Sequence, residues 1–592
     1  MRSDLIIGIA GAGGDGVVSA GEALITAAAL EGYYAMLTKS FGSQIRGGEC
    51  SCRLRIATQA VLNPGGTLDV AVALNWQDFS KFGAELPVGR HTVVIYDSKA
   101  GVAPDSIPLD GVKPAEVLAV PIGEMAKQAA GTDRAKNVLV LGLLAGWLGI
   151  PRQRILASIR QQFVKQMPEV MAGNERAFAA GIAYTEAHPW ENGSPLAAAA
   201  AGTTPLLTDG NHMCAAAAIY AGCQFFSGYP ITPSSEIMQF LNREIWKYGG
   251  TLLQAEDEMA GVGAAVGASF AGKKAMTATS GPGMSLKAEI LGLASMAELP
   301  LVCVNVQRGG PSTGLPTKSE QADLFQAIFS AHGDVVRPVL APVSVADTFG
   351  ITVEAFNIAE QYQTPVIVLS DQAIAQRKET VQRIDTGAMQ LLDRRRPTAT
   401  ELDHYARFRL TESGISPLTR PGVEGGTYLA SGIEHNEHGA PTGSGTEHAR
   451  MNAKRLKKLH PLKRRYDLFV LEGDQGAPVG LISWGSMAGV ALEALRWAQA
   501  EGLRVKLLVP KLLYPVSEEI YQHFFASVET GLVVEQSHQG QLHKVIRMYV
   551  DVPAGVESLA KSSSNPITAD EVVKRLRELA SARERGRRKG AA

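Results

Sequence analysis

The chain has 592 residues, of which 45% are apolar and 19% charged, and its formal net charge is −1. This length predicts about three or four domains with ample core, and the near-neutral balance excludes the strong positive field of a general nucleic-acid binder. Its five cysteines are too few and too scattered for a disulfide framework or an iron–sulfur cluster. Because we find no secretory pattern at the start and no apolar run long enough to span a bilayer, a reduced, cytoplasmic protein is predicted.

The first predicted elements are a strand, a glycine turn and a helix. Leu5–Ala10 has the composition of a buried strand, Gly11–Gly16 that of a tight turn, and Val17–Leu30 that of a helix. This matches the G-x-G-x-x-G spacing of a dinucleotide site, so a NAD(P)-dependent dehydrogenase is one alternative for the chain. The next strand, Tyr34–Thr38, ends at Lys39 without an acid for a ribose hydroxyl, which favours a phosphate- or adenylate-binding domain instead.

A glycine-flanked loop with a single cation follows this strand. The loop is Ser40–Gly48 and the cation is Arg46, so a structural turn and an anion contact are both open. Strands and helices then alternate as far as Tyr184. We therefore predict a first α/β domain over residues 1–188 and a proline- and alanine-rich linker over 189–205.

Two prolines bracket a threonine at the start of the next amphipathic helix. In the stretch Phe225–Glu236, Pro233 holds Thr232 out of the helix, which predicts Thr232 as the N-cap and Pro233 as the first helical residue. A helix N-terminus with a hydroxyl at its mouth is suited to a carboxylate. The structural alternative is an ordinary cap on a buried helix.

Three acidic residues precede a helix built almost wholly of small residues, which ends near Gly267. Glu256 and Asp257 are at positions where capping and the helix dipole explain an acid. Glu258 lies deepest in the apolar run, where a lone carboxylate is costly unless it finds a hydrogen-bond partner.

Two further strands, Ala275–Thr279 and Leu301–Val306, each end in a glycine-rich loop. Four polar residues thus each follow a strand: Thr232, Glu258, Ser280 and Arg308. Because the carboxyl ends of parallel strands meet at one edge of a sheet, we expect the four to form a site there.

Val366–Ser370 is the last strand predicted for this second domain, which we place at 206–380. Residues 381–470 are polar and rich in proline and glycine, and a segment of this length is predicted to wrap another surface such as a neighbouring subunit. His435 and His438 lie in it without further ligands, so no metal site is predicted in this chain.

Three strands that alternate with helices predict a third α/β domain at 471–592. They are Val479–Trp484, Val505–Val509 and Leu532–Glu535. The predicted fold class is therefore α/β, with several three-layer open-sheet domains.

Four segments stand in an order and spacing that carry a family resemblance. They are Tyr229–Pro233, Gln254–Gly267, Thr277–Gly283 and Gln307–Glu320. Together they resemble the alpha subunit of the 2-oxoacid:ferredoxin oxidoreductases, most of all those that act on 2-oxoglutarate. The first domain resembles the family's gamma subunit, fused here to the N-terminus, the second a pyrimidine-type thiamine-diphosphate domain, and the third a transketolase C-terminal-like domain.

The resemblance implies an enzyme that decarboxylates 2-oxoglutarate with thiamine diphosphate, transfers the acyl unit reversibly to coenzyme A as succinyl-CoA, and passes electrons to ferredoxin. Pyruvate, branched-chain and aryl 2-oxoacids are alternative substrates. A non-catalytic scaffold subunit is a further alternative.

The resemblance also implies roles for single residues. Glu258 matches the carboxylate at the aminopyrimidine ring, Thr232 the threonine beside substrate and cofactor, and Arg308 the arginine that binds the substrate acid. The remaining implied positions are Tyr229, Pro230, Ile231 and Ser280 for the cofactor, Lys318 for a distal substrate carboxylate, and Gly13, Gly14 and Arg46 for coenzyme A.

The chain lacks the family's thiamine diphosphate–magnesium motif and its cluster cysteines. The resemblance therefore implies a separate beta subunit that holds the diphosphate with Mg²⁺ and carries a [4Fe-4S] cluster. We expect an (αβ)₂ heterotetramer that works with ferredoxin, no nucleic-acid or membrane partner, and no activity from this polypeptide alone.

Overall fold

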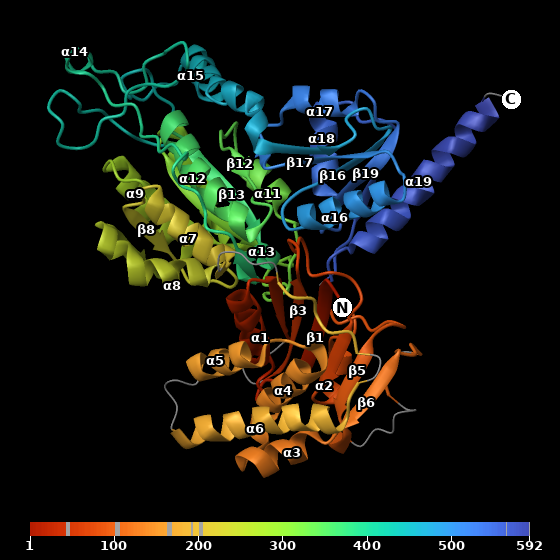
Figure 1. Cartoon of the computed structure of the whole chain (residues 1–592). Helices are drawn as coiled ribbons and strands as arrows, with labels where there is room; N and C mark the ends of the chain where they lie inside the picture. Colours follow the sequence, from red (N-terminus) through yellow and green to blue (C-terminus); the bar gives the residue numbers. More distant parts are fainter. Residues whose placement is uncertain are drawn as a thin grey trace. The chain divides into compact units, whose positions relative to one another are not determined.

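A computed structural model describes residues 1–42, 48–100, 107–109, 111–162, 168–190, 193–199, 205–563 and 565–590. The chain forms two compact units: unit 1 is Met1–Thr208 with Gln376–Ile384, and unit 2 is Asp209–Ala375 with Asp385–Ala592. Three sheets of eight, seven and five strands, flanked by helices, confirm the predicted α/β class (Figure 1). No helix within the described residues is long and apolar enough to cross a membrane.

Unit 1 contains the eight-stranded sheet, in the order β6-β5-β4-β1-β3-β2-β14-β7. Its strands are β1 (Asp4–Ala12), β2 (Tyr34–Phe41), β3 (Glu49–Ala57), β4 (Val70–Ala73), β5 (Val93–Asp97), β6 (Glu116–Val120), β7 (Leu206–Asp209) and β14 (Lys378–Val381). β1 pairs in parallel with β4 and antiparallel with β3. β3 thus separates β1 from β2, whereas in a dinucleotide-binding fold the strand after the first helix lies beside the first strand.

Helices cover both faces of this sheet. They are α1 (Val17–Glu31), α2 (Trp76–Lys81), α3 (Ile122–Ala130), α4 (Lys136–Leu148), α5 (Arg152–Gln162) and α6 (Pro168–Ala187). Leu5, Ile7 and Ile9 pack in one core cluster with α1, α3, α4, α5 and α6, whereas Ala10 packs with α2 in another. This alternation follows from the two-residue period of a strand.

Residues 376–384 return to unit 1, although we expected the second domain to continue to residue 380. Within them, β14 pairs antiparallel with β2, and Lys378 forms an ion pair with Glu22 of α1. Thr380 Oγ1 also accepts a hydrogen bond from Ala35 N at 2.8 Å. The pairing joins residues far apart in sequence, so no local pattern indicates it.

Unit 2 contains the seven-stranded sheet, in the order β18-β12-β13-β11-β10-β8-β9. Its strands are β8 (Phe225–Gly228), β9 (Thr251–Gln254), β10 (Ala275–Thr279), β11 (Leu301–Gln307), β12 (Val339–Leu340), β13 (Pro365–Asp371) and β18 (Leu512–Tyr514). All neighbouring pairs from β12 to β9 are parallel, and β18 is antiparallel to β12.

The helices of this part are α7 (Gly210–Tyr220), α8 (Ser235–Glu244), α9 (Glu258–Phe270), α10 (Gly281–Met296), α11 (Leu324–Phe329), α12 (Val345–Tyr362) and α13 (Gln372–Gln376). Right-handed crossovers place α8 and α12 on one face of the sheet and α9 and α10 on the other. The helix contacts agree, because α7 packs against both α8 and α12, and α9 packs against α10.

The five-stranded sheet of unit 2 has the order β15-β17-β16-β19-β20. Its strands are β15 (Phe469–Gly473), β16 (Val479–Ser483), β17 (Val505–Pro510), β19 (Thr530–Glu535) and β20 (Gly555–Ala560), and its helices are α16 (Met487–Ala500), α17 (Glu518–Phe525), α18 (Gln541–Tyr549) and α19 (Ala569–Gly590). The three predicted strands are confirmed, and β15 and β20 are additional. β18 comes from this part of the chain but joins the seven-stranded sheet, which ties the predicted second and third domains together.

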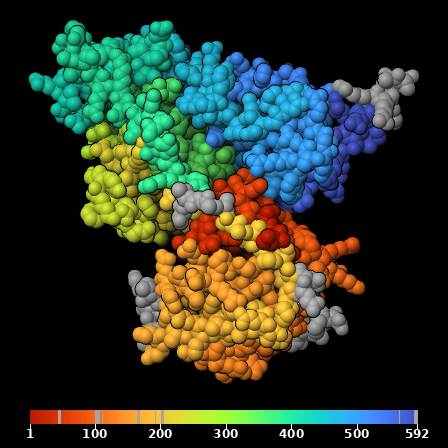
Figure 2. All heavy atoms as spheres, in the orientation of Figure 1, coloured from red at the N-terminus to blue at the C-terminus, as the bar shows by residue number. Residues whose placement is uncertain are grey.

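Residues 385–468 contain only the short helix α14 (Ala399–Leu402), α15 (Gly445–Lys457) and two 3₁₀ turns, His460–Arg464 and Tyr466–Leu468. The segment packs on its own unit, where it forms the teal surface in Figure 2. Arg394 binds Glu360 of α12, and Lys454 binds Glu298 after α10, both inside the protein. A contact with a neighbouring subunit stays a prediction.

Candidate active site at the edge of the seven-stranded sheet

The order of the strands reverses between β8 and β10. The chain leaves β8 through α8 toward β9, and it leaves β10 through α10 toward β11, in the opposite direction across the sheet. Ligands of open α/β sheets bind outside the carboxyl ends of the strands where the order reverses in this way. The loop after β8, the first turn of α9 and the loops after β10 and β11 all meet at this edge.

Arg308 and Thr232 are in direct contact here. Arg308 follows β11, is 6% exposed, and donates from Nη1 to the carbonyl oxygen of Thr232 at 2.6 Å. Its Nε is buried without a hydrogen-bond partner. Burial lowers the pKa of Arg308, against an opposing effect of Asp323. The guanidinium therefore keeps donors for an anionic group from outside the chain.

The predicted cap on α8 is wrong. The helix begins at Ser235, and Ser234 occupies the cap position without a side-chain hydrogen bond. Ser234 N donates to Ile231 O at 2.9 Å, and Asn211 Nδ2 donates to Pro233 O at 2.7 Å. These contacts hold residues 231–234 in a tight turn, so Thr232 lies before the helix rather than at its end.

Glu258 is the first residue of α9 and is 7% exposed. Asp257 caps this helix, because its side chain accepts from Ala260 N at 2.7 Å. A Cβ atom added to Gly283 would lie 2.8 Å from Glu258 Oε1, and one added to Gly261 would lie 3.1 Å from the Gly228 Cα. The glycines thus let α9 approach β8 and let the first turn of α10 approach the carboxylate.

The Glu258 carboxylate accepts no hydrogen bond from a described residue. The buried Lys287 donates instead to the Glu258 carbonyl oxygen at 3.0 Å and to Thr277 Oγ1 at 3.1 Å. Lys287 therefore fixes the backbone of the first helical turn and leaves the carboxylate available.

Buried polar atoms without partners gather on the same three strands. They are Ser227 Oγ in β8, Thr279 Oγ1 and Ser280 Oγ at the end of β10, Asn305 Oδ1 in β11 and Arg308 Nε. A buried polar group without a partner costs roughly 1–3 kcal/mol in proteins. This concentration at the carboxyl edge indicates that a ligand supplies the missing partners.

Sequence reasoning missed Asp323, which also faces this edge. Asp323 Oδ2 accepts from Asn305 Nδ2 at 3.0 Å, and Asp323 N donates to Gln307 Oε1 at 3.0 Å. Burial raises the pKa of Asp323 to about 6, although the Asn305 hydrogen bond and the Arg308 charge oppose the rise. An acid just before the short helix α11 (Leu324–Phe329) has the pattern of an ordinary cap, so no local signal marks Asp323 as functional.

Gln321 was missed as well, and it links this edge to the five-stranded sheet. It is buried, donates from N to Gln536 O at 2.6 Å and from Nε2 to Trp484 O at 2.8 Å, and accepts from Gln536 N at 2.8 Å. The segment that carries Asp323 is thus held from both sheets of unit 2.

The other predicted substrate and cofactor positions lie in loops at the same edge. The Lys318 carbonyl accepts from Gly309 N at 2.9 Å, which places the Lys318 backbone beside the residue after Arg308. Tyr229 is exposed, and Pro230 and Ile231 are partly exposed, in the loop after β8.

The positions predicted for coenzyme A lie in unit 1. Gly13 and Gly14 are in the turn after β1, where Asp15 Oδ2 accepts from Ala12 N at 2.9 Å and open space surrounds Gly14. Arg46 lies outside the described residues. Nearby, burial raises the pKa of Cys50 to about 11 and that of Cys52 to about 12, so both remain protonated thiols near neutral pH.

No group of three or more His, Cys, Asp or Glu suited to a metal ion occurs within the part of the chain that the structure describes. His435 is buried with its ring centroid 3.9 Å from that of Phe408, and its Nδ1 pairs with Ile433 O at 3.0 Å. These contacts explain His435 as a core residue.

Two family models match this chain. The one described as "Pyruvate flavodoxin/ferredoxin oxidoreductase, thiamine diP-bdg" matches residues 216–454, and "Pyruvate ferredoxin/flavodoxin oxidoreductase" matches residues 6–184. The first match contains Thr232, Glu258 and Arg308, and the second contains the glycine turn of unit 1.

Curated and solved relatives cover nearly the whole chain. "2-oxoacid:ferredoxin oxidoreductase 2, subunit alpha" of Aeropyrum pernix is 31% identical over 97% of this chain and 98% of its own length. "2-oxoglutarate oxidoreductase subunit KorA" of Mycobacterium tuberculosis is 33% identical over 96% of this chain and 90% of its own length. The structure of 2-oxoglutarate:ferredoxin oxidoreductase from Magnetococcus marinus, with 2-oxoglutarate, coenzyme A and succinyl-CoA bound, has a TM-score of 0.92 and 37% identity, covering 98% of this chain and all of that chain.

Proposed function

The chain belongs to the 2-oxoacid:ferredoxin oxidoreductase family, and we propose that it is the alpha subunit of a 2-oxoglutarate:ferredoxin oxidoreductase. Its reaction is the reversible, coenzyme A-dependent oxidative decarboxylation of 2-oxoglutarate to succinyl-CoA, with electrons passed to ferredoxin. The observation that carries the proposal is the edge where Arg308 contacts Thr232 while the Glu258 carboxylate and several buried polar atoms lack partners.

The residues at this edge fit the pyrimidine half of thiamine diphosphate. Glu258 offers a nearly buried carboxylate that accepts no hydrogen bond from a described residue, and Ser280 Oγ is a buried hydroxyl without a partner. Tyr229, Pro230 and Ile231 supply the adjoining loop. When bound, the cofactor acts as the electron sink for decarboxylation. Glu258 would hold a proton at the aminopyrimidine ring of the bound cofactor.

Arg308 and Thr232 would bind the substrate. The planar guanidinium suits a carboxylate, and its contact with the Thr232 carbonyl fixes one edge so that the free donors point to the ligand. Thr232 would lie beside the substrate carboxylate that Arg308 binds. Lys318 is our candidate for binding the distal carboxylate of 2-oxoglutarate. Asp323 is close enough to influence the pKa of Arg308 and so modulates anion binding.

A beta subunit would complete the site. Large apolar side chains are exposed in the loop after β8, in β9, in the first turn of α9, in the second turn of α10 and in the loop after β11: Tyr229, Leu253, Met259, Leu286 and Leu315. Such a grouping is typical of a protein interface. The partner would hold the diphosphate with Mg²⁺ and carry a [4Fe-4S] cluster, in an (αβ)₂ assembly that reduces ferredoxin.

Coenzyme A would bind at the gamma-like domain, where Gly13 and Gly14 leave the backbone of the turn accessible. Arg46, the third position that we propose for coenzyme A, lies outside the described residues. A NAD(P) site at the same turn is disfavoured, because β3 separates β1 from β2 in the sheet. Pyruvate and branched-chain or aryl 2-oxoacids remain the alternative substrates for the main site.

The test is to produce the chain together with its beta subunit and to purify the complex. We expect a small brown partner, bound thiamine diphosphate, and faster carbon dioxide release from 2-oxoglutarate than from pyruvate when coenzyme A and ferredoxin are present. Faster turnover of pyruvate would overturn the substrate assignment. Binding of NADH to the purified chain, followed by fluorescence, would favour the dehydrogenase alternative.

A further inference from the structure

A cavity of unit 2 lies at the opposite end of the seven-stranded sheet from the candidate active site. It is lined by Gly272, Arg394, Arg396, Pro397, Leu402, Leu418, Thr419, Arg420 and Val423, with a volume of about 120 Å³. Gly272 precedes β10 and Ser280 follows it, so the two sites are at opposite ends of a strand that is roughly 17 Å long at the usual rise.

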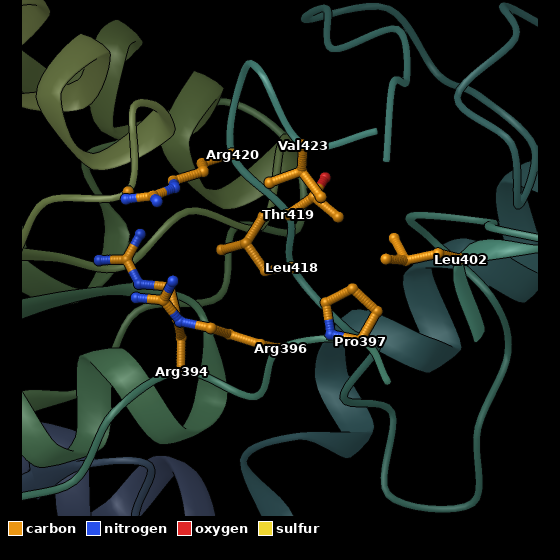
Figure 3. A pocket seen from close by; sticks show the side chains of 9 residues that line it. Arg394, Arg396, Pro397, Leu402, Leu418, Thr419, Arg420 and Val423 are labelled. Carbon is orange, nitrogen blue, oxygen red and sulfur yellow. The ribbon is translucent and has the colours of Figure 1, made fainter. Parts of the chain in front are cut away.

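The cavity has a cationic side and an apolar side. Figure 3 shows the nitrogen-bearing ends of Arg394, Arg396 and Arg420 on one side, and Pro397, Leu402 and Val423 on the other. The lining contains three arginines and no acidic residue. Its shape and chemistry therefore suit a molecule with an anionic end and an apolar end.

The three arginines have different roles. Arg394 is buried, and its side chain forms two hydrogen bonds with Glu360 and donates to the carbonyl oxygens of Ser269 and Lys273. It therefore fixes the floor of the cavity. Arg396 and Arg420 are exposed and pair with no described acid, so their donors remain available.

The acids nearby in sequence do not neutralise these two arginines. Asp393 pairs with Lys274, and Glu401 pairs with Arg395 and Arg409. Glu424, next to Val423, forms no ion pair with a described residue. The Arg420 stem lies against Gly272, where an added Cβ would lie 3.1 Å from Arg420 Cδ. Two neighbouring guanidinium groups that pair with no described acid favour a bound anion.

We propose that this cavity binds a small organic anion, whose phosphate or carboxylate contacts Arg396 and Arg420 and whose apolar part lies against Leu402, Leu418 and Val423. An engineered apolar cavity of about 150 Å³ accepts benzene, so a single ring is of the right size for a site that also opens to solvent. The proposal is independent of the function of the main site, because none of its residues belongs to that site.

The test titrates phenyl phosphate, inorganic phosphate and benzoate into the full chain at low ionic strength, by calorimetry. We expect phenyl phosphate or benzoate to bind at least tenfold more tightly than inorganic phosphate, because only these probes use the apolar wall. The stronger of the two identifies the preferred anionic group.

Two variants assign the binding to this cavity. R396A/R420A is expected to weaken binding at least tenfold. R496A/R547A, which removes the same charge from exposed positions on α16 and α18, is expected to leave it unchanged. V423S is expected to reduce the advantage of phenyl phosphate over inorganic phosphate. Equal weakening in both double variants, or no binding of any probe to the wild-type chain, would overturn the proposal.

Discussion

Glu298 and Glu258 are two buried carboxylates of unit 2 that differ in their hydrogen-bond partners. Both oxygens of Glu298, after α10, accept from Lys454 Nζ at 2.6 and 2.7 Å, and Lys458 also contacts this carboxylate. Glu258, at the start of α9, is nearly as buried, but no described residue donates to its carboxylate. A buried charge with internal partners holds the fold together, whereas one without them is kept for a ligand.

The largest expected effect comes from Glu258. We expect E258Q to reduce turnover of the assembled complex by roughly 100- to 10,000-fold, because the amide cannot hold the proton that general acid–base catalysis requires. Steady-state assays with 2-oxoglutarate measure this loss. The urea midpoint of the full chain should stay unchanged, and unimpaired turnover would instead favour a scaffold role for this subunit.

E298Q is the reciprocal change at the paired carboxylate. Burial alone would raise the pKa of Glu298, but the charges of Lys454 and Lys458 outweigh it and lower the pKa below the usual range. Removing the negative charge leaves the lysines buried without their counter-ion, so we expect a loss of roughly 3–5 kcal/mol in unfolding free energy. Urea unfolding measures it. An unchanged midpoint would contradict the structural role of this cluster.

A substitution at Arg308 tests whether its guanidinium donors, of which Nε has no partner in the protein, bind the substrate. We expect R308K to raise the KM for 2-oxoglutarate about 10- to 100-fold with a smaller change in kcat, because a lysine cannot form the two-donor contact with a carboxylate. The matched control R337K changes a buried arginine that donates to the main-chain oxygens of Gln326 and Ile328. Its effect should appear in stability rather than in KM.

Asp323 makes the edge sensitive to pH. As the pH rises through about 6, Asp323 becomes charged and opposes an anionic substrate at Arg308, so the KM should increase. We expect D323N to flatten the pH dependence of KM between pH 5 and 7, an effect of about 2- to 10-fold at an effective dielectric constant near 20. The measurement is the KM for 2-oxoglutarate at several pH values across this range. An unchanged pH profile in D323N would exclude Asp323 as the source of the pH dependence.

The smallest effect concerns the surplus cation in the Glu298 cluster. Burial lowers the pKa of Lys458 to about 7 despite the opposing effect of Glu298, whereas an unfolded lysine titrates near 10.4. Between these values the unfolded state binds more protons, so stability should rise with pH. We expect K458M to remove this rise and to change stability at pH 7 by about 1 kcal/mol or less. Urea midpoints at pH 7 and 9.5 measure the slope, and an identical slope in K458M would place its origin elsewhere.

The strands, the helices and the sheet edge where the polar residues meet could all be predicted from local sequence patterns. Local period and glycine placement predicted the strands before Thr232, Ser280 and Arg308, and because parallel strands end at one edge, these residues had to approach one another. The contact between Arg308 and the Thr232 carbonyl agrees with that expectation. Their catalytic roles rest on the family resemblance and await the experiments above.

The contacts between segments far apart in the chain could not be predicted in this way and became visible only in the folded protein. Local pattern placed Thr232 at a helix cap, but the Asn211 hydrogen bond to Pro233 and the turn at Ser234 start the helix later. Three further features depend on long-range pairing. They are the return of β14 to unit 1, the hydrogen bonds of Gln321 to the five-stranded sheet, and the position of Asp323 beside Asn305 at the site. Such pairing leaves no local period in the sequence, because its energy comes from partners that only the folded chain brings together.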